Sequence, residues 1–173
     1  MNRELLHVDV LSLLKELIAI PSFSRAEDKT ATLMMDFLSA RGIPAYRYKN
    51  NIWAVSRAFN PGLPTVLLNS HHDTVKPVKQ YTRDPFHPEE EAGKLFGLGS
   101  NDAGGCLVSL IATFVHFYDS NQLPFNLVLA ATAEEEITGS DGIEALLAHE
   151  DFLKCVHIDR FKQNFARWCA IVG

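Results

Sequence analysis

The sequence predicts an α/β fold in which helices pack on a mostly parallel sheet. Stretches with apolar residues at helical spacing alternate along the chain with short, β-branched apolar runs of strand length. These apolar runs are continuous, which is typical of strands that helices cover on both faces. The 173 residues, 47% of them hydrophobic, are enough for one packed domain, or for one domain of something larger.

The first third of the chain predicts two helices and a hairpin. Residues 3–20 carry apolar side chains at helical spacing, and a proline ends this helix. A second helix is expected over residues 27–41, with Ser22 or Ser24 as its N-cap. Two alternating runs on either side of an Asn-Asn pair predict a hairpin over residues 44–57.

The rest of the chain continues the alternation of strand and helix. Buried strands are expected over residues 65–70 and 126–133, because both runs are short and apolar. Between them, residues 76–102 form a long polar connection whose prolines and glycines exclude a regular helix. The other expected elements are helices over residues 103–120, 139–150 and 151–168, and the start of a strand over residues 169–173.

Charge and cysteine content narrow the class of protein. The net charge is −5 and no cluster of Lys and Arg is visible, which argues against nucleic acid as a partner. The three cysteines are scattered, so they predict no disulfide framework and favour a reducing cytosol. No stretch approaches the ~20 apolar residues that span a bilayer. We therefore expect a cytoplasmic protein with neither nucleic acid nor membrane as a partner.

Two histidines and an aspartate directly follow the strand predicted over residues 65–70. Side chains two positions apart in extended backbone face the same side, so His71 and Asp73 should point together and His72 away from them. This geometry suits a metal-bound imidazole whose second ring nitrogen is held by a carboxylate. The His-x-Asp pattern is common, however, and a purely structural role fits the sequence equally well.

A single carboxylate, Asp102, stands in the glycine-rich stretch "GLGSNDAGG". Glycine allows backbone to approach a ligand closely, which favours a site here. The alternative is that Asp102 caps the following helix. Nucleotide binding is disfavoured, because Asp102 occupies the third glycine position of GxGxxG and would repel a pyrophosphate.

Three adjacent glutamates, Glu134, Glu135 and Glu136, follow the second buried strand. Such a run is usually a solvated surface, yet the carboxyl edge of an open α/β sheet is where ligands bind. Neighbouring glutamates can point in different directions, so one could bind metal while the next moves protons. One imidazole and several carboxylates suit zinc. The absence of HExxH argues against a zinc protease of that type, and the absence of GxSxG argues against a serine hydrolase. Cys106 is expected in the core and not as a nucleophile.

The three motifs "SHHDTV", "GLGSNDAGG" and "TAEEEITGS", in this order, closely resemble the M20 family of metallopeptidases and deacylases. The sequences of these motifs are most similar to the acetylornithine deacetylase branch, which removes an acyl group from an N-acyl amino acid. The resemblance extends to about Leu147 and resumes at "AIVG". It implies a zinc-peptidase-like catalytic domain with two zinc ions, for which cobalt or manganese can substitute. It further implies a small N-acyl amino acid as substrate, a role in arginine biosynthesis, and a homodimer of the full-length protein.

The resemblance also implies a role for each matching position. His71 would bind the first metal, and Asp73 would orient the His71 ring. Asp102 would bridge both ions, and Glu136 would bind the second metal. Glu135 would be the general base. Glu134 would have no direct catalytic role, and the peptide bond after Asp102 would be cis. Glu135 would take a proton from a water between the ions and pass it to the leaving amine.

The sequence departs from the family pattern at its end. A carboxylate ligand is expected just after "AIVG", and a histidine ligand and a lid and dimerisation domain beyond it, but the sequence stops at Gly173. We therefore expect the N-terminal part of a catalytic domain, inactive by itself, in which His149 and His157 are surface residues instead of replacement ligands. The alternatives are an aminopeptidase, dipeptidase or desuccinylase of the same family, or a non-catalytic fragment that carries half of a site.

Overall fold

The structure is a computed structural model that describes residues 3–156. The strand expected over residues 169–173, His157 and most of the helix expected over residues 151–168 lie outside the described residues.

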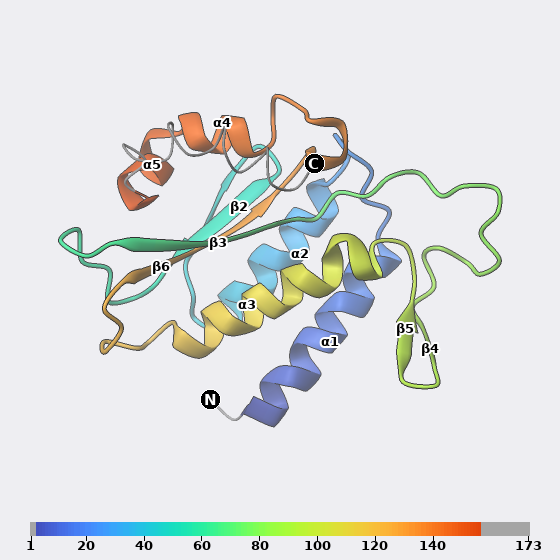
Figure 1. The fold of residues 1–173 in the computed structure, drawn as a ribbon, viewed down its shortest axis with the longest axis horizontal. Helices are drawn as coiled ribbons and strands as arrows, with labels where there is room; N and C mark the ends of the chain where they lie inside the picture. Colours follow the sequence, from blue (N-terminus) through green and yellow to red (C-terminus); the bar gives the residue numbers. More distant parts are fainter. Residues whose placement is uncertain (1–2, 157–173) are drawn as a thin grey trace.

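Helices cover both faces of one four-stranded sheet (Figure 1). The longer helices lie on one face, and the shorter ones lie on the other. The helices are α1 (Arg3–Ala19), α2 (Asp28–Ser39), α3 (Cys106–Phe117), α4 (Ile143–Ala148) and α5 (Glu150–Val156). Of these described helices, none has the length and apolar character needed to cross a membrane.

The sheet runs in the order β1-β2-β6-β3, and its strand directions are mixed. The strands are β1 (Ala45–Tyr48), β2 (Asn51–Val55), β3 (Thr65–His71) and β6 (Asn126–Thr132). Only β3 and β6 pair in parallel among the described strands, whereas β1 with β2 and β2 with β6 are antiparallel. The α/β class is confirmed. The sheet, expected to be mostly parallel, is mixed, because the hairpin of β1 and β2 joins β6 through β2 in the antiparallel direction.

Two hydrophobic clusters, one on each face, hold these layers together. The larger cluster packs α1, α2 and α3 on the sheet, with Leu13, Ile111 and Phe114 fully buried. The smaller cluster packs Leu146 of α4 and Phe152 of α5 against Trp53 of the sheet. Every residue of β6 is buried, as its continuous apolar run predicts.

The parallel pair of strands sets the position of the candidate site. In its register, His71 at the end of β3 lies opposite Thr132 at the end of β6. Both strands therefore end at the same edge of the sheet, and the residues that follow them are neighbours in space.

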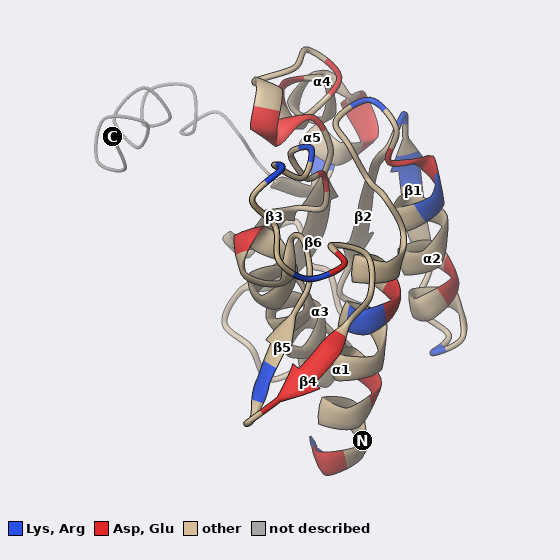
Figure 2. Ribbon diagram, turned by 90° about the vertical axis from the view of Figure 1, so that its right-hand side faces the viewer, with Lys and Arg blue, Asp and Glu red and all other residues tan. Residues whose placement is uncertain are grey.

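The long connection contains a hairpin that the sequence did not predict. Strands β4 (Glu89–Glu91) and β5 (Lys94–Phe96) pair across a turn in which Ala92 and Gly93 both have positive φ, 50° and 75°. An ion pair from Lys15 to Glu90, 2.7 Å, joins this hairpin to α1. Figure 2 shows the acidic β4 beside α1.

Candidate metal centre

His71 and Asp73 point to the same side of the chain, which confirms the expectation from strand alternation. His71 Nδ1 lies 3.3 Å from Asp73 Oδ1 and 3.1 Å from the carbonyl oxygen of the same residue. The opposite ring nitrogen, Nε2, lies 3.1 Å from Asp102 Oδ1 and 3.7 Å from Glu135 Oε2. Burial alone lowers the pKa of His71, but the hydrogen bond to Asp73 and the surrounding carboxylates raise it to about 9.

Asp73 is fully buried and joins the end of β3 to the loop over residues 133–139 that follows β6, here called the acidic loop. Its oxygens accept hydrogen bonds from the Ser24 hydroxyl at 2.7 Å and from the amides of Glu135 and Glu136 at 3.1 Å each. Burial raises the pKa of Asp73, but the hydrogen bonds from His71, Ser24 and the two amides outweigh it and hold the pKa at about 2. Ser24 therefore orients Asp73, and neither it nor any other side chain caps α2.

His72 faces away from the cluster and is part of the packed interior. Its Nε2 donates to the Asn50 carbonyl at 3.0 Å, and its Nδ1 lies 2.9 Å from the Thr30 hydroxyl. Burial lowers the pKa of His72 to about 4, so the ring is neutral near pH 7. A neutral ring with its proton on Nε2 leaves Nδ1 as an acceptor. The single proton of the Thr30 hydroxyl is then shared between Nδ1 and the Glu27 carbonyl oxygen, which lies 2.9 Å from the hydroxyl. His72 therefore points away from His71 and Asp73, as strand alternation predicts, and its role is structural.

Asp102 does not cap the following helix, which was the alternative reading of the glycine-rich stretch. An irregular turn spans Ser100–Gly105, with a cis peptide bond between Asp102 and Ala103, as the resemblance implied, and α3 begins only at Cys106. The Asp102 side chain is 77% exposed and directs one oxygen at His71.

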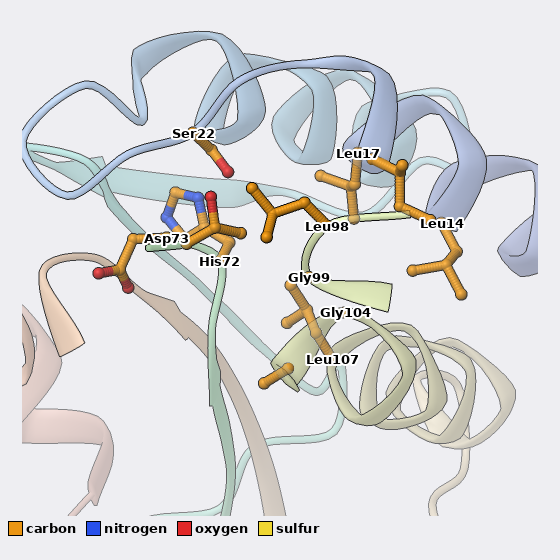
Figure 3. Close-up of a pocket in the computed structure, with 12 residues that line it drawn as sticks. Leu14, Leu17, Ser22, His72, Asp73, Leu98, Gly99, Gly104 and Leu107 are labelled. Atoms are coloured by element: carbon orange, nitrogen blue, oxygen red, sulfur yellow. The ribbon is translucent and has the colours of Figure 1, made fainter. Parts of the chain in front are cut away.

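Glycines and leucines support this turn from behind (Figure 3). Figure 3 shows a small pocket where Leu14 and Leu17 of α1 face Leu98 and Leu107 around Gly104. A Cβ at position 104 would lie 2.6 Å from the carbonyl oxygen of residue 99 and 2.7 Å from Leu14 Cδ1. Only glycine permits so close an approach, and this packing against residue 99 and Leu14 holds the turn that carries Asp102 in place.

The three glutamates of the acidic loop diverge, as expected. Glu134 has a left-handed conformation, φ 54°, and its buried carboxylate lies 3.9 Å from Arg25 Nε. Glu135 is 59% exposed, whereas Glu136 joins the cluster. The pKa of Glu136 is raised, first by burial and then by the negative charge of Asp102.

The residues fit a divalent metal. Ligand atoms of His71, Asp102 and Glu136 all lie within 4.8 Å of one another. Imidazole nitrogen and carboxylate oxygen are ligands that zinc accepts, and the second nitrogen of His71 is held by Asp73 as metal-bound imidazoles require. Like charges gathered around a single imidazole also favour a cation at this point.

Two further residues were misjudged or missed from the sequence. Cys106 is exposed rather than buried, because α3 begins there and packs through the residues that follow. His149 packs against the rings of Tyr48 and Trp53, at 4.6 and 5.2 Å, so it is partly covered and not a plain surface residue. Among the described residues, it belongs to no group of metal-capable side chains.

The acidic loop also has supports that no sequence signal singled out. The Asn51 side chain accepts a hydrogen bond from the amide of Ala133 at 3.0 Å, and Glu27 accepts one from the amide of Glu134 at 3.1 Å. A glutamate at a helix start is typically exposed, so its burial here could not be recognised from the sequence.

Comparison with known proteins finds matches to this chain by sequence and by structure. Residues 67–166 match the sequence profile of Peptidase family M20/M25/M40. The chain is 30% identical to a succinyl-diaminopimelate desuccinylase of Xanthomonas campestris over 78% of its own length, and 34% identical to an acetylornithine deacetylase of Proteus mirabilis over 73%. It spans only 37% and 35% of these two relatives. An M20 family metallo-carboxypeptidase from Sulfolobus solfataricus superposes with a TM-score of 0.66 at 26% identity, covering 80% of this chain and 33% of that one.

Proposed function

Because the chain belongs to Peptidase family M20/M25/M40, we propose that it serves in the metal-dependent hydrolysis of an amide, removing the acyl group from an N-acyl amino acid. The observation that carries this proposal is the gathering of His71, Asp102 and Glu136, with ligand atoms within 4.8 Å of one another, beside the exposed carboxylate of Glu135.

His71, Asp102 and Glu136 would hold the metal. Zinc is the proposed metal, and cobalt or manganese can take its place. When bound, such an ion acts as a Lewis acid, which polarises a carbonyl and makes nearby water more acidic. Asp73 keeps the His71 ring in the orientation that points Nε2 outward, through the 3.3 Å contact to Nδ1.

Glu135 has the position of a general base. Its carboxylate is 59% exposed and lies 3.7 Å from His71 Nε2, so it reaches both the cluster and solvent. Its backbone amide is fixed by Asp73 at 3.1 Å. We propose that Glu135 takes the proton of the attacking water and then passes it to the leaving amine nitrogen.

The acyl group is assigned by direct comparison of substrates. An acetyl group and ornithine are favoured by the likeness to the Proteus mirabilis deacetylase, and a succinyl group by the likeness to the Xanthomonas campestris desuccinylase. Rates on N-acetylornithine, N-succinylornithine and a dipeptide separate a deacetylase, a desuccinylase and a peptidase. In any form of the protein that hydrolyses one of these substrates, Glu135→Ala should abolish hydrolysis while zinc stays bound, and hydrolysis at the normal rate would refute its role as the base.

Zinc content after dialysis tests whether the cluster of His71, Asp102 and Glu136 binds a metal. The chain should retain zinc, and Asp102→Asn should lose it, because asparagine keeps the shape but not the charge. Asp36→Asn, the same change at an exposed position of α2, is the matched control and should retain zinc. A chain that retains no more zinc than Asp102→Asn would show that this cluster is not a metal centre and would favour a non-catalytic protein.

A further inference from the structure

Successive backbone amides of the acidic loop are held by side-chain oxygens. The amide of Ala133 donates to Asn51 Oδ1 at 3.0 Å, and the amide of Glu134 donates to Glu27 Oε1 at 3.1 Å. The next two amides donate to the two oxygens of Asp73, at 3.1 Å each. Two buried carboxylates therefore support the loop, and the roles described so far use only that of Asp73.

Glu27 is fully buried at the N-cap position of α2, yet its side chain makes no capping hydrogen bond. Its Oε1 accepts a second hydrogen bond from the amide of Arg25 at 2.9 Å, and its Oε2 accepts one from Asn50 Nδ2 at 2.8 Å. An ionised carboxylate only accepts hydrogen bonds, so these three donors match the ionised form. Burying such a charge is costly, and capping of α2 does not account for it.

The amide that Glu27 holds belongs to the corner of the acidic loop. Glu134 is left-handed there, with φ 54°, which is uncommon for a residue with a side chain. The corner is fixed from its other side too, because the amide of Gly139 donates to the Glu134 carbonyl at 2.9 Å. The two carboxylates that follow, Glu135 and Glu136, leave the backbone in directions that this corner sets.

We propose that Glu27 is a positioning residue for the metal centre. Through the amide of Glu134, it places the carboxylates of Glu135 and Glu136 relative to His71. The inference rests on the proposed function, and it adds a residue whose own side chain touches no residue of the ligand cluster. Supporting residues of this kind change metal affinity by about 10- to 100-fold when they are replaced.

One substitution and its rescue isolate this role. Glu27→Gln keeps the size of the side chain and one oxygen for the backbone amides, but its new NH2 group faces the NH2 group of Asn50. Asn50 cannot simply turn its amide over, because its Oδ1 already accepts from Arg47 Nη2 at 2.8 Å. Adding Asn50→Asp places an acceptor opposite the new donor. Glu144→Gln makes the same change at an exposed position of α4 and serves as the control.

Two measurements on the full 173-residue chain follow from this design. The first is zinc affinity by competition with a chromophoric chelator, at a temperature where every variant is folded by circular dichroism. The second is hydrogen exchange of the amides of residues 133–136 in the metal-free chain. Glu27→Gln should weaken zinc binding about 10- to 100-fold and speed exchange of the loop, the double variant should recover most of both, and Glu144→Gln should match the parent.

The outcomes separate this inference from the proposed function. If Glu27→Gln melts earlier but keeps its zinc affinity within about twofold, Glu27 is a structural residue only and the inference is overturned. A double variant that stays as weak as Glu27→Gln would also overturn it, because the loss would then come from general disruption. If the parent chain binds no zinc, the proposed function fails, and amide exchange decides: exchange unchanged by Glu27→Gln refutes the positioning role, and faster exchange that the double variant reverses supports it.

Discussion

Replacing Asp73 by asparagine measures what the buried carboxylate beneath His71 contributes. Asparagine has nearly the same shape, but one of its oxygens becomes an NH2 group that donates where the carboxylate accepts. In the native site, the two oxygens face the Ser24 hydroxyl, the His71 ring and two backbone amides. At least one of these donors would then face another donor in a fully buried position.

The expected loss follows from the pKa of Asp73, which is about 2 against an ordinary value of 3.8. At about 1.4 kcal/mol per pKa unit, the native contacts stabilise the ionised form by about 2 kcal/mol at neutral pH. An unsatisfied buried donor adds about 1–3 kcal/mol. We therefore expect Asp73→Asn to lower the free energy of unfolding by about 3–5 kcal/mol, the range for breaking a buried charged contact.

The pH dependence gives this prediction its sign. A carboxylate whose pKa is lowered by folding stabilises the protein above pH 3.8, and that stability is lost as the pH falls from 3.8 to about 2. The variant lacks the group, so the difference between parent and variant should shrink across this interval. Urea denaturation of the chelator-treated chain, followed by tryptophan fluorescence, measures the free energy of unfolding of parent and variant at each pH. Asp36→Asn is the exposed control. A difference below about 1 kcal/mol at neutral pH would refute the reasoning.

Further predictions concern the support of the site and the core. Thr30→Val removes the hydroxyl that contacts both His72 Nδ1 and the Glu27 carbonyl oxygen and should cost about 1–2 kcal/mol in urea denaturation, while Thr30→Ser, which keeps the hydroxyl, should retain most of that stability. Because burial lowers the pKa of His72 from 6.5 to about 4, this residue should favour folding above pH 6.5 and progressively less down to pH 4, which chelator-treated thermal melts can follow. Gly139→Ala would put a Cβ 1.9 Å from Glu134 Oε2 and should weaken zinc binding about tenfold in chelator competition. Phe114→Ala, in the core, should cost about 3–5 kcal/mol in urea without selective loss of zinc.

The position of the candidate site could be predicted because local rules act in the same direction there. Strand alternation put His71 and Asp73 on one side, and their contact at 3.3 Å agrees. The parallel register of β3 and β6 then brings the acidic loop to the same edge, as buried strands with a helix between them suggest. Short-range patterns are enough for these features.

The direction of the outer strands could not be read in the same way. A two-residue turn makes β1 and β2 antiparallel, and that pair was expected. Which strand of the hairpin then joins β6, and in which direction, depends on packing between segments far apart in the sequence. The hairpin of β4 and β5 was not predicted, because its paired strands are short and its Ala92-Gly93 turn is not one of the usual hairpin turn sequences.

Buried charge was the hardest feature to foresee. Glu27 and Asp73 are both fully buried carboxylates, and only Asp73 lies in a recognisable motif. The partners that make the burial of Glu27 tolerable come from Arg25, Asn50 and the distant Glu134. No local pattern announces such a set, because it exists only after the chain has folded.

The crowding of carboxylates around His71 sets folding stability against function. In the metal-free chain, Asp102 and Glu135 raise the pKa of Glu136 after burial does, which means that their charges repel one another there. Glu136→Gln would relieve that repulsion and should give a metal-free chain no less stable than the parent, while removing a ligand. Selection for thermal stability alone would therefore act against this ligand, and a library screened only for melting temperature should accumulate neutral residues at position 136.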